Sequence, residues 1–154
     1  MPDNKSPQIN FADCYVLSTK RTKDFIISFL QKFLPEAEEY MDTYQVPELA
    51  EQPSHTFNSV LGLIEHLETH ATEQHAIYWS NKKANTLRGA MCLFMNDGQI
   101  IFGLVTETLS PNTALEDSLL QQLMAFCDSK QGLILYEEPA PRFTNAFLER
   151  IKPR

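Results

Sequence analysis

Glycine is scarce in this chain, where only five of the 154 residues are glycines. The sequence contains no glycine-rich phosphate loop, no G-x-S-x-G nucleophile elbow, no H-E-x-x-H zinc motif and no EF-hand spacing. These absences argue against nucleotide-dependent enzymes and common hydrolases. An active site can also be built from residues that are scattered in the sequence, so an enzyme remains the alternative to a binding protein.

Cysteines and long apolar runs are also few. Cys14, Cys92 and Cys127 lie far apart and form no C-x-x-C pair, which disfavours a zinc ribbon and a disulfide framework. Each stands in an apolar pattern, so we expect buried free thiols with a raised pKa. No stretch approaches the roughly 18 apolar residues of a membrane helix, and the first residues lack the apolar core of a signal peptide. We therefore expect a cytoplasmic protein.

The rest of the composition is that of a folded domain, with 43% hydrophobic residues. We expect residues 1–10 to form a flexible N-terminal tail and residues 11–154 to form a single α+β domain. The formal net charge of −7 opposes nucleic-acid binding, because that binding depends on cations that neutralise phosphates. We expect neither a nucleic acid nor a membrane as a partner.

The spacing of apolar residues predicts the element order β-α-α-β-β-β-α-β-α, with a central antiparallel β-meander and flanking helices. The first helix should run over 21–41 and kink at Pro35 or end its first half at Leu34. Residues 42–56 are expected to be a long surface loop, and 57–74 a second helix. Thr113 and Glu116 have capping-box spacing at the start of a third helix, which Gly132 should close with a left-handed cap. A strand over 133–136 and a helix over 145–151 should follow.

The segment Asn96-Asp97-Gly98-Gln99 predicts a β-hairpin between residues 87–95 and 100–107. A two-residue turn at Asp97 and Gly98 would pair Met95 with Ile100 and bring Arg88 opposite Glu107. Both faces of this hairpin are apolar, so both must be covered. Helices of the same chain are one cover, and a second subunit in a homodimer is the other.

Lysine and arginine are absent from residues 33–81, where composition alone would place about four. The same window holds nine acids and all four histidines. One interpretation is a solvated acidic face, and the other is a surface that steers a basic protein partner. The second interpretation selects seven partner-binding residues, in which the tyrosines are aromatic anchors: Glu38, Glu39, Tyr40, Asp42, Tyr44, Glu48 and Glu51.

Two smaller groups are also candidate sites. Lys20, Arg21 and Lys23 lie where a strand meets a helix, and helix amides together with cations attract anions. His66 and His70 are four residues apart on a predicted helix, so their imidazoles could bind a divalent transition metal. The structural alternatives are solvated cations at a helix start and two surface histidines.

The sequence favours a small acidic intracellular protein that binds a basic protein and inhibits it in the manner of an immunity protein, without enzymatic activity. This inference rests on size and charge. The alternative is a small-ligand or metal-dependent enzyme with a site near His66 and His70.

Overall fold

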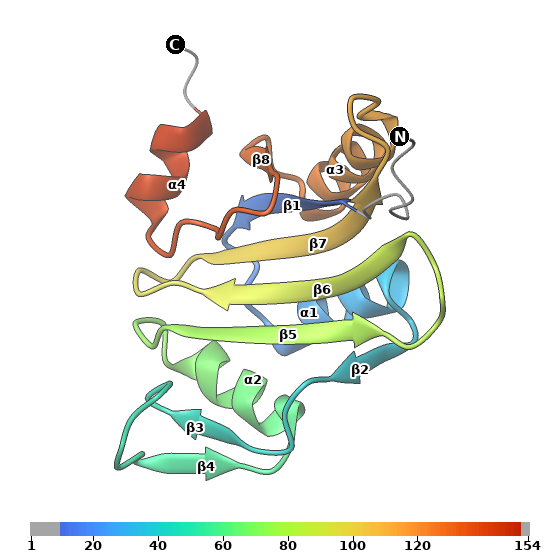
Figure 1. Cartoon of the computed structure of the whole chain (residues 1–154). Coiled ribbons are helices and arrows are strands. Elements are labelled where there is room, and N and C mark those ends of the chain that lie inside the picture. Colours follow the sequence, from blue (N-terminus) through green and yellow to red (C-terminus); the bar gives the residue numbers. More distant parts are fainter. Residues whose placement is uncertain (1–9, 152–154) are drawn as a thin grey trace, which may run out of the picture.

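The computed structural model describes residues 10–151, in which six strands form one antiparallel sheet in the order β2-β5-β6-β7-β1-β8 (Figure 1). The strands of this sheet are β1 (Asn10–Ser18), β2 (Ala37–Glu39), β5 (His75–Asn81), β6 (Leu87–Phe94), β7 (Ile100–Thr108) and β8 (Gly132–Leu135). A separate hairpin consists of β3 (Tyr44–Val46) and β4 (His55–Phe57). The helices are α1 (Lys23–Phe33), α2 (Val60–Thr69), α3 (Ala114–Cys127) and α4 (Thr144–Ile151).

The α+β class and the central meander of β5, β6 and β7 are thus confirmed. The predicted N-terminal tail lies outside the described residues, apart from Asn10 at the start of β1. Within residues 10–151, no helix has both the length and the apolar character needed to cross a membrane.

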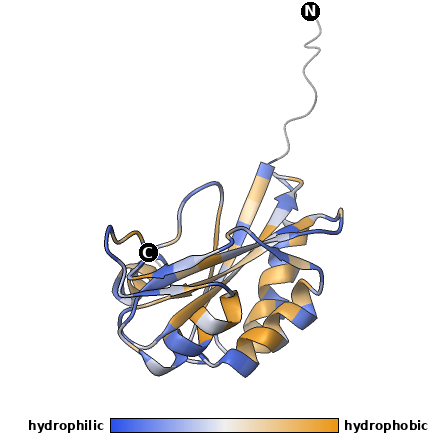
Figure 2. Ribbon diagram, turned by 90° about the horizontal axis from the view of Figure 1, so that it is seen from below, coloured by the Kyte–Doolittle hydropathy of each residue, from blue (hydrophilic) through white to orange (hydrophobic). Residues whose placement is uncertain are grey.

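Two hydrophobic cores lie on opposite faces of the sheet. On one face, α1, α2 and α3 pack against the strands, and Phe29, Ile64 and Leu123 are fully or almost fully buried there. Figure 2 shows helices with many hydrophobic residues beneath the sheet. On the other face, α4 packs its Phe147 against a smaller core with Leu93 and Ile101. Both faces of the β6–β7 hairpin are therefore apolar, as predicted, and helices of the same chain contribute to both cores.

Proline and short strands explain why the elements predicted in the first half of the chain differ from the structure. Helix α1 ends at Phe33 and is capped by Leu34, as the Pro35 pattern allowed, but the chain then enters the edge strand β2 instead of continuing as a helix to residue 41. Residues 42–56 are not a structureless loop, because they contain β3 and most of β4. The side chains of Tyr44 and Val46 in β3 are buried, which ties this hairpin to the core.

The ends of α3 also differ from prediction. Thr113 makes no side-chain capping bond, and Glu116 is turned inward, where it accepts hydrogen bonds from the hydroxyls of Thr108 and Tyr136. The predicted capping box is therefore wrong. The left-handed residue that ends the helix is Asp128, with φ 50°, whereas Gly132 belongs to β8.

The β6–β7 hairpin has a register one residue away from the predicted one. Met95 donates its amide to the carbonyl of Gln99, and Phe94 pairs with Ile100, so the loop has three residues instead of two. Gly98 has φ 84°, the left-handed conformation that closes such a loop. A β-bulge at Arg88 shifts the register again, and Arg88 still forms the expected ion pair with Glu107 at 3.2 Å.

Arg21 binds three separate segments of the fold to one another. It is 5% exposed, and its guanidinium lies 4.9 Å from the ring centroid of Phe94. Its nitrogens donate five hydrogen bonds, all to backbone carbonyls: Leu67 (3.1 Å), Met95 (2.7 Å), Gln99 (3.2 Å), His70 (3.0 Å) and Glu73 (2.8 Å). The start of α1, the end of α2 and the β6–β7 turn are thereby held together.

Replacing Arg21 by Lys should therefore lower the free energy of unfolding by about 2–4 kcal/mol, because a compact ammonium group cannot reach five carbonyls from separate segments. Urea denaturation measures this loss. Arg88→Lys is the control, since Arg88 forms an exposed ion pair and its change should cost less than about 1 kcal/mol. Equal losses in the two variants would contradict this role of the guanidinium.

Candidate functional site

Three hollows border on Arg142, and the central one lies on the face of the sheet opposite α1, α2 and α3, which we call the open face. The central hollow, of about 390 Å³, lies over β1, β5 and β6 and contains Asp13, Tyr15 and Tyr78. The hairpin hollow, of about 430 Å³, extends from Tyr78 to Leu49 after β3. A third hollow, of about 470 Å³, lies beside Phe143. These volumes are in the range of ligand-binding pockets.

Arg142 is held from several sides. Its Nη2 lies 3.6 Å from Oε1 of Glu48, and its carbonyl accepts a hydrogen bond from the side chain of Gln74 at 2.8 Å. Its Nε is buried and has no hydrogen-bond partner within residues 10–151. Arg142 therefore has a bonded backbone, one ion pair and an unused donor where the hollows meet.

Glu48 and His75 form the ion pair behind Arg142. Oε2 of Glu48 lies 3.0 Å from Nδ1 of His75 and accepts the amide of Ala76 at 2.7 Å. Burial opposes both charges, but the hydrogen bond and the charge of Glu48 outweigh it and raise the pKa of His75. Burial likewise opposes ionisation of Glu48, yet the bonds from His75 and Ala76 lower its pKa. The pair links the residues after β3 to the start of β5.

The hairpin hollow has an aromatic and aliphatic lining. The rings of Tyr40 and Tyr78 stack with their centroids 6.3 Å apart, and Met41 and Leu49 line the same hollow. Leu49 is 92% exposed and has φ 63°, a left-handed conformation that is unfavourable for leucine. Large apolar side chains therefore face solvent in one place on the open face.

The central hollow combines an apolar floor with polar groups. Met91 and Leu93 of β6 lie beside Asp13 and Tyr15 of β1 in its lining. Burial, together with the charge of Glu137, raises the pKa of Asp13 to about 6. Beneath the hollow is Gly103, and a Cβ atom there would come within 2.5 Å of Cγ of Met91 and 3.1 Å of Cδ1 of Tyr15. The floor thus depends on a residue without a side chain.

Of the predicted partner-binding residues, Tyr40, Tyr44 and Glu48 line the hairpin hollow. Met41 lines it too, although it was not selected from the sequence. Tyr44 has its ring inside the protein and donates its hydroxyl to Glu39 at 2.9 Å. The other predicted acids lie at the surface and form no side-chain hydrogen bond or ion pair with the described part of the chain: Glu38, Asp42 and Glu51.

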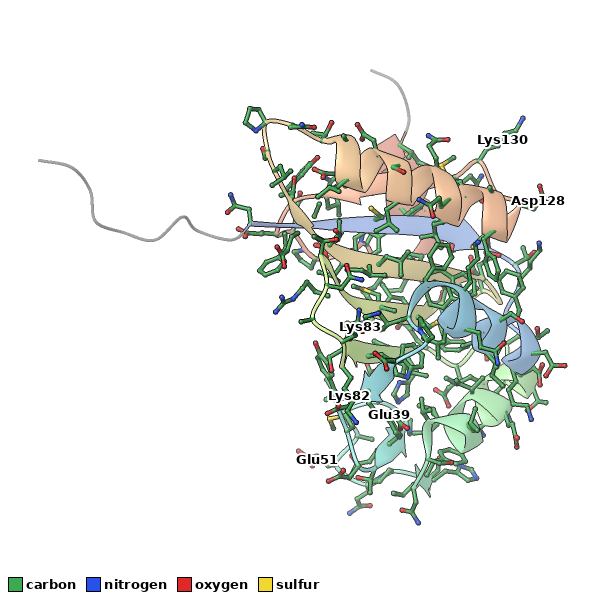
Figure 3. The ribbon with its side chains drawn as sticks, turned by 90° about the vertical axis from the view of Figure 1, so that its right-hand side faces the viewer. Glu39, Glu51, Lys82, Lys83, Asp128 and Lys130 are labelled. Atoms are coloured by element: carbon green, nitrogen blue, oxygen red, sulfur yellow. The ribbon has the colours of Figure 1, made fainter. Side chains whose placement is uncertain are left out.

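The fold brings cations next to part of the acidic window. The amide of Lys82 binds the carbonyl of Glu36 at 3.0 Å, so the β5–β6 loop lies beside β2. In the view of Figure 3, Lys82 is drawn next to Glu39, with Lys83 above them and Glu51 below them. The acidic surface is therefore less extended in space than in the sequence. Besides Glu48, which lines the hairpin hollow, Asp42 and Glu51 lie within two residues of its lining in the chain.

The predicted anion site at the start of α1 is occupied by groups of the protein itself. Arg21 binds only carbonyls, and a carboxylate oxygen of Glu68 accepts the backbone amide of Lys23 at 3.1 Å. The ammonium group of Lys23 pairs with Glu65 at 2.8 Å, and that of Lys20 lies over the ring of Phe25. The sequence indicated that this helix end attracts anions, and the anionic group bound there is the carboxylate of Glu68.

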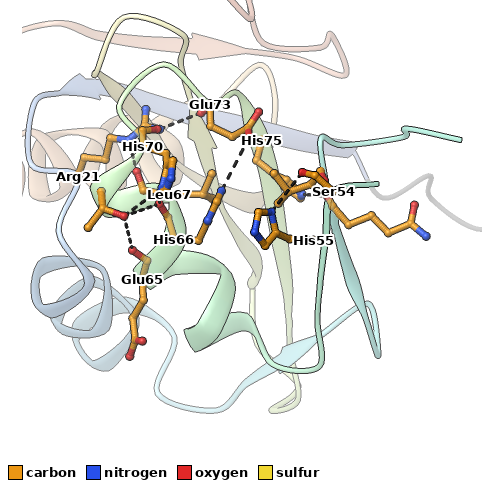
Figure 4. A network of polar contacts seen from close by, with 12 residues as sticks. Arg21, Ser54, His55, Glu65, His66, Leu67, His70, Glu73 and His75 are labelled. Atoms are coloured by element: carbon orange, nitrogen blue, oxygen red, sulfur yellow. Dashed lines mark hydrogen bonds and ion pairs between the residues drawn. The ribbon is translucent and has the colours of Figure 1, made fainter. Parts of the chain in front are cut away.

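His66 and His70 do lie together, at the end of α2 (Figure 4). Their rings stack with centroids 3.9 Å apart, so their in-plane lone pairs cannot converge on one ion in this arrangement. Nε2 of His66 is buried without a hydrogen-bond partner and lies 3.9 Å from a carboxylate oxygen of Glu73. No group of three or more His, Cys, Asp or Glu residues in the described ranges is placed to hold a metal. Metal binding here stays a prediction.

The three cysteines are buried and free, as predicted. Burial raises the pKa of Cys14 and of Cys127 to about 12, and that of Cys92 well above its ordinary value. A thiol nucleophile is disfavoured by these environments.

The sequence did not predict the central hollow, because its polar residues come from β1, β5 and the segment before α4.

Comparisons of the chain with protein-family models, with curated proteins and with solved structures found no match.

The Glu48–His75 pair should contribute to stability in a defined pH window. The raised pKa of His75 makes its contribution complete below about pH 6.5 and lost as the pH rises through the folded value, while the lowered pKa of Glu48 makes its contribution complete above about pH 4.5. His75→Gln should therefore cost about 1–3 kcal/mol more at pH 5.5 than at pH 8.5. Urea denaturation at both pH values measures this difference. His55→Gln, at an exposed histidine, is the control and should show no comparable change.

The metal prediction has a direct test. Metal analysis of the purified protein that finds stoichiometric zinc, iron or manganese, lost in His70→Ala, would support a site at His66 and His70. A protein without these metals and without affinity for added zinc would end the prediction.

Proposed function

We propose that this protein is a small, acidic, non-enzymatic binding module, which binds a basic protein over the hairpin hollow and inhibits it as an immunity protein does. A cytoplasmic location is part of the proposal, because three free thiols suit a reducing compartment. Partner and inhibition are inferred from the surface chemistry, and location from the buried thiols.

The observation that supports the proposal most is the clustering of exposed apolar side chains. Among residues 10–151, nine large hydrophobic residues are exposed, and five of them line the hairpin hollow or the third hollow. These five are Tyr40, Met41, Leu49, Tyr78 and Phe143. Contiguous exposed apolar surface is uncommon outside binding sites, and tyrosine is frequent at interface hot spots.

Charge indicates the kind of partner. Asp42 and Glu51 flank the hairpin hollow in the chain, and both are exposed without a side-chain partner in the described residues. Their negative potential acts within the acidic window of residues 33–81 and adds to the net charge of −7. A basic protein would be attracted at long range by these acids and would bury the apolar lining on contact.

The partner is first identified by affinity capture from the native lysate, at low salt and at about 0.5 M salt, where charges are screened within a few ångströms. The proposal expects a basic protein whose retention weakens at high salt. The activity of the captured basic protein should fall when an equal amount of the acidic protein that captured it is added. A captured second copy of this chain, or a partner insensitive to salt, would contradict the proposal.

The binding surface is then tested with matched variants. Asp42→Asn combined with Glu51→Gln should slow association several-fold at low salt, because steering by these acids is lost. The control, Gln121→Lys combined with Gln122→Lys on the exposed side of α3, raises the net charge by the same two units and should leave the association rate within about twofold.

The apolar lining is tested in the same binding assay. Tyr40→Ala and Leu49→Ala should each speed dissociation at least tenfold, since these side chains are exposed in the free protein and would be buried in the complex. Leu115→Ala is the control, because Leu115 is also an exposed leucine but lies on α3. Unchanged dissociation in both lining variants would show that the partner binds elsewhere.

A further inference from the structure

The central hollow contains polar groups that lack partners. Tyr15 is 4% exposed and lines this hollow, yet its hydroxyl forms no hydrogen bond with any described residue. The carboxylate of Asp13, half-buried beside it, also accepts no hydrogen bond from residues 10–151. Both polar groups reach the hollow instead of the sealed interior, so each is available to a ligand atom or to water.

The carboxylate of Asp13 also has no cation of its own. Arg142 lies at the edge of the hollow but is paired with Glu48, and Arg150 is bound by Glu138 through two bonds of 2.9 and 3.2 Å. Glu137 lies near Asp13 and has the same charge, which adds to the negative potential. No ion pair within the described ranges reaches Asp13.

The remaining lining suits a long aliphatic stem that ends in a flat cation. Met91 and Leu93 form an apolar floor, and Tyr78 contributes an exposed aromatic ring at the wall. Guanidinium groups bind carboxylates through a planar fork, and they stack on aromatic faces more readily than ammonium groups do.

We propose that the central hollow takes an arginine side chain of the partner, with its guanidinium on the Asp13 carboxylate and the Tyr15 hydroxyl and its methylene groups on Met91 and Leu93. This inference rests on the proposed function, since it assigns one residue of the basic partner to one hollow. The hairpin hollow next to it, across Tyr78, then takes apolar parts of the same partner.

The titration of Asp13 supplies a signature for this binding. Its pKa of about 6 is set by burial and by Glu137, and the other titratable or charged groups that line its hollow are Tyr15, Tyr78, Glu138 and Arg142. A bound guanidinium favours the ionised carboxylate, so binding should release a proton near pH 6. Affinity should be about tenfold weaker at pH 5 than at pH 7.5, because about a tenth of Asp13 is ionised at pH 5.

The test uses acetyl-arginine methylamide as the probe and the full chain labelled in its methionine methyl groups. We expect the NMR signal of Met91 to shift on titration, and binding to be at least fivefold weaker for the citrulline analogue, which has the same shape and no charge. The carboxyl signal of Asp13, followed in a second sample with carbon-13 in its aspartate side chains, should titrate at a lower pH when the probe is bound. Equal binding of arginine and citrulline, or no shift of Met91 at high probe concentration, would overturn the inference.

Asp13→Asn and Asp24→Asn make a matched pair of variants, because each removes one negative charge and Asp24 lies on α1, across the sheet. Asp13→Asn should abolish the preference for arginine over citrulline and the pH dependence, while Asp24→Asn should keep both. A hollow that selects arginine in a protein that captures no basic partner would support this site and refute the wider function. A basic partner that binds the Asp13→Asn variant and the natural protein equally tightly would support the wider function and refute the arginine site.

Discussion

The buried guanidinium of Arg21 determines how the two halves of the fold meet. The last carbonyls of a helix have no partners within that helix, and Arg21 supplies donors to the end of α2 and to the residues that follow it. The same side chain binds the two ends of the β6–β7 turn. A cation at the carboxyl end of α2 is also favoured by the helix dipole. Strand β5 begins two residues after the last of these contacts, so Arg21 holds the segment that leads into β5, the strand that carries Tyr78 to the open face.

Two arginines illustrate the difference between a structural and an available side chain. Arg21 uses all its nitrogens on carbonyls and is almost fully buried, although its neighbours in the sequence suggested a basic surface. Arg142 approaches Glu48 with one nitrogen and has an unused Nε where three hollows meet. The sequence does not separate these two roles, because the difference lies in which carbonyls and carboxylates the fold brings within reach.

Periodic segments were predictable, and local geometry was not. The apolar spacing located α1 and α2 and the strands of the meander, because long patterns average over local exceptions. Strands of three residues such as β3 have no such pattern, and the register of the β6–β7 hairpin depended on whether its loop held two or three residues. The acidic window was visible in the sequence, but not the approach of Lys82 or the pairing of Glu48 with His75. Asp13 and Tyr15 gave no signal, since one follows an alanine in an ordinary strand and the other resembles a core tyrosine.

Gly103 controls the capacity of the open face from below. Its neighbours Met91 and Tyr15 occupy the space that a side chain at this position would take. Any larger residue there would push the side chain of Met91 or Tyr15 toward the central hollow and reduce its volume. The residues that line the hollow would themselves be unchanged. The size of ligand that this fold accepts is thus set in part at the centre of β7, by a residue that the ligand does not contact.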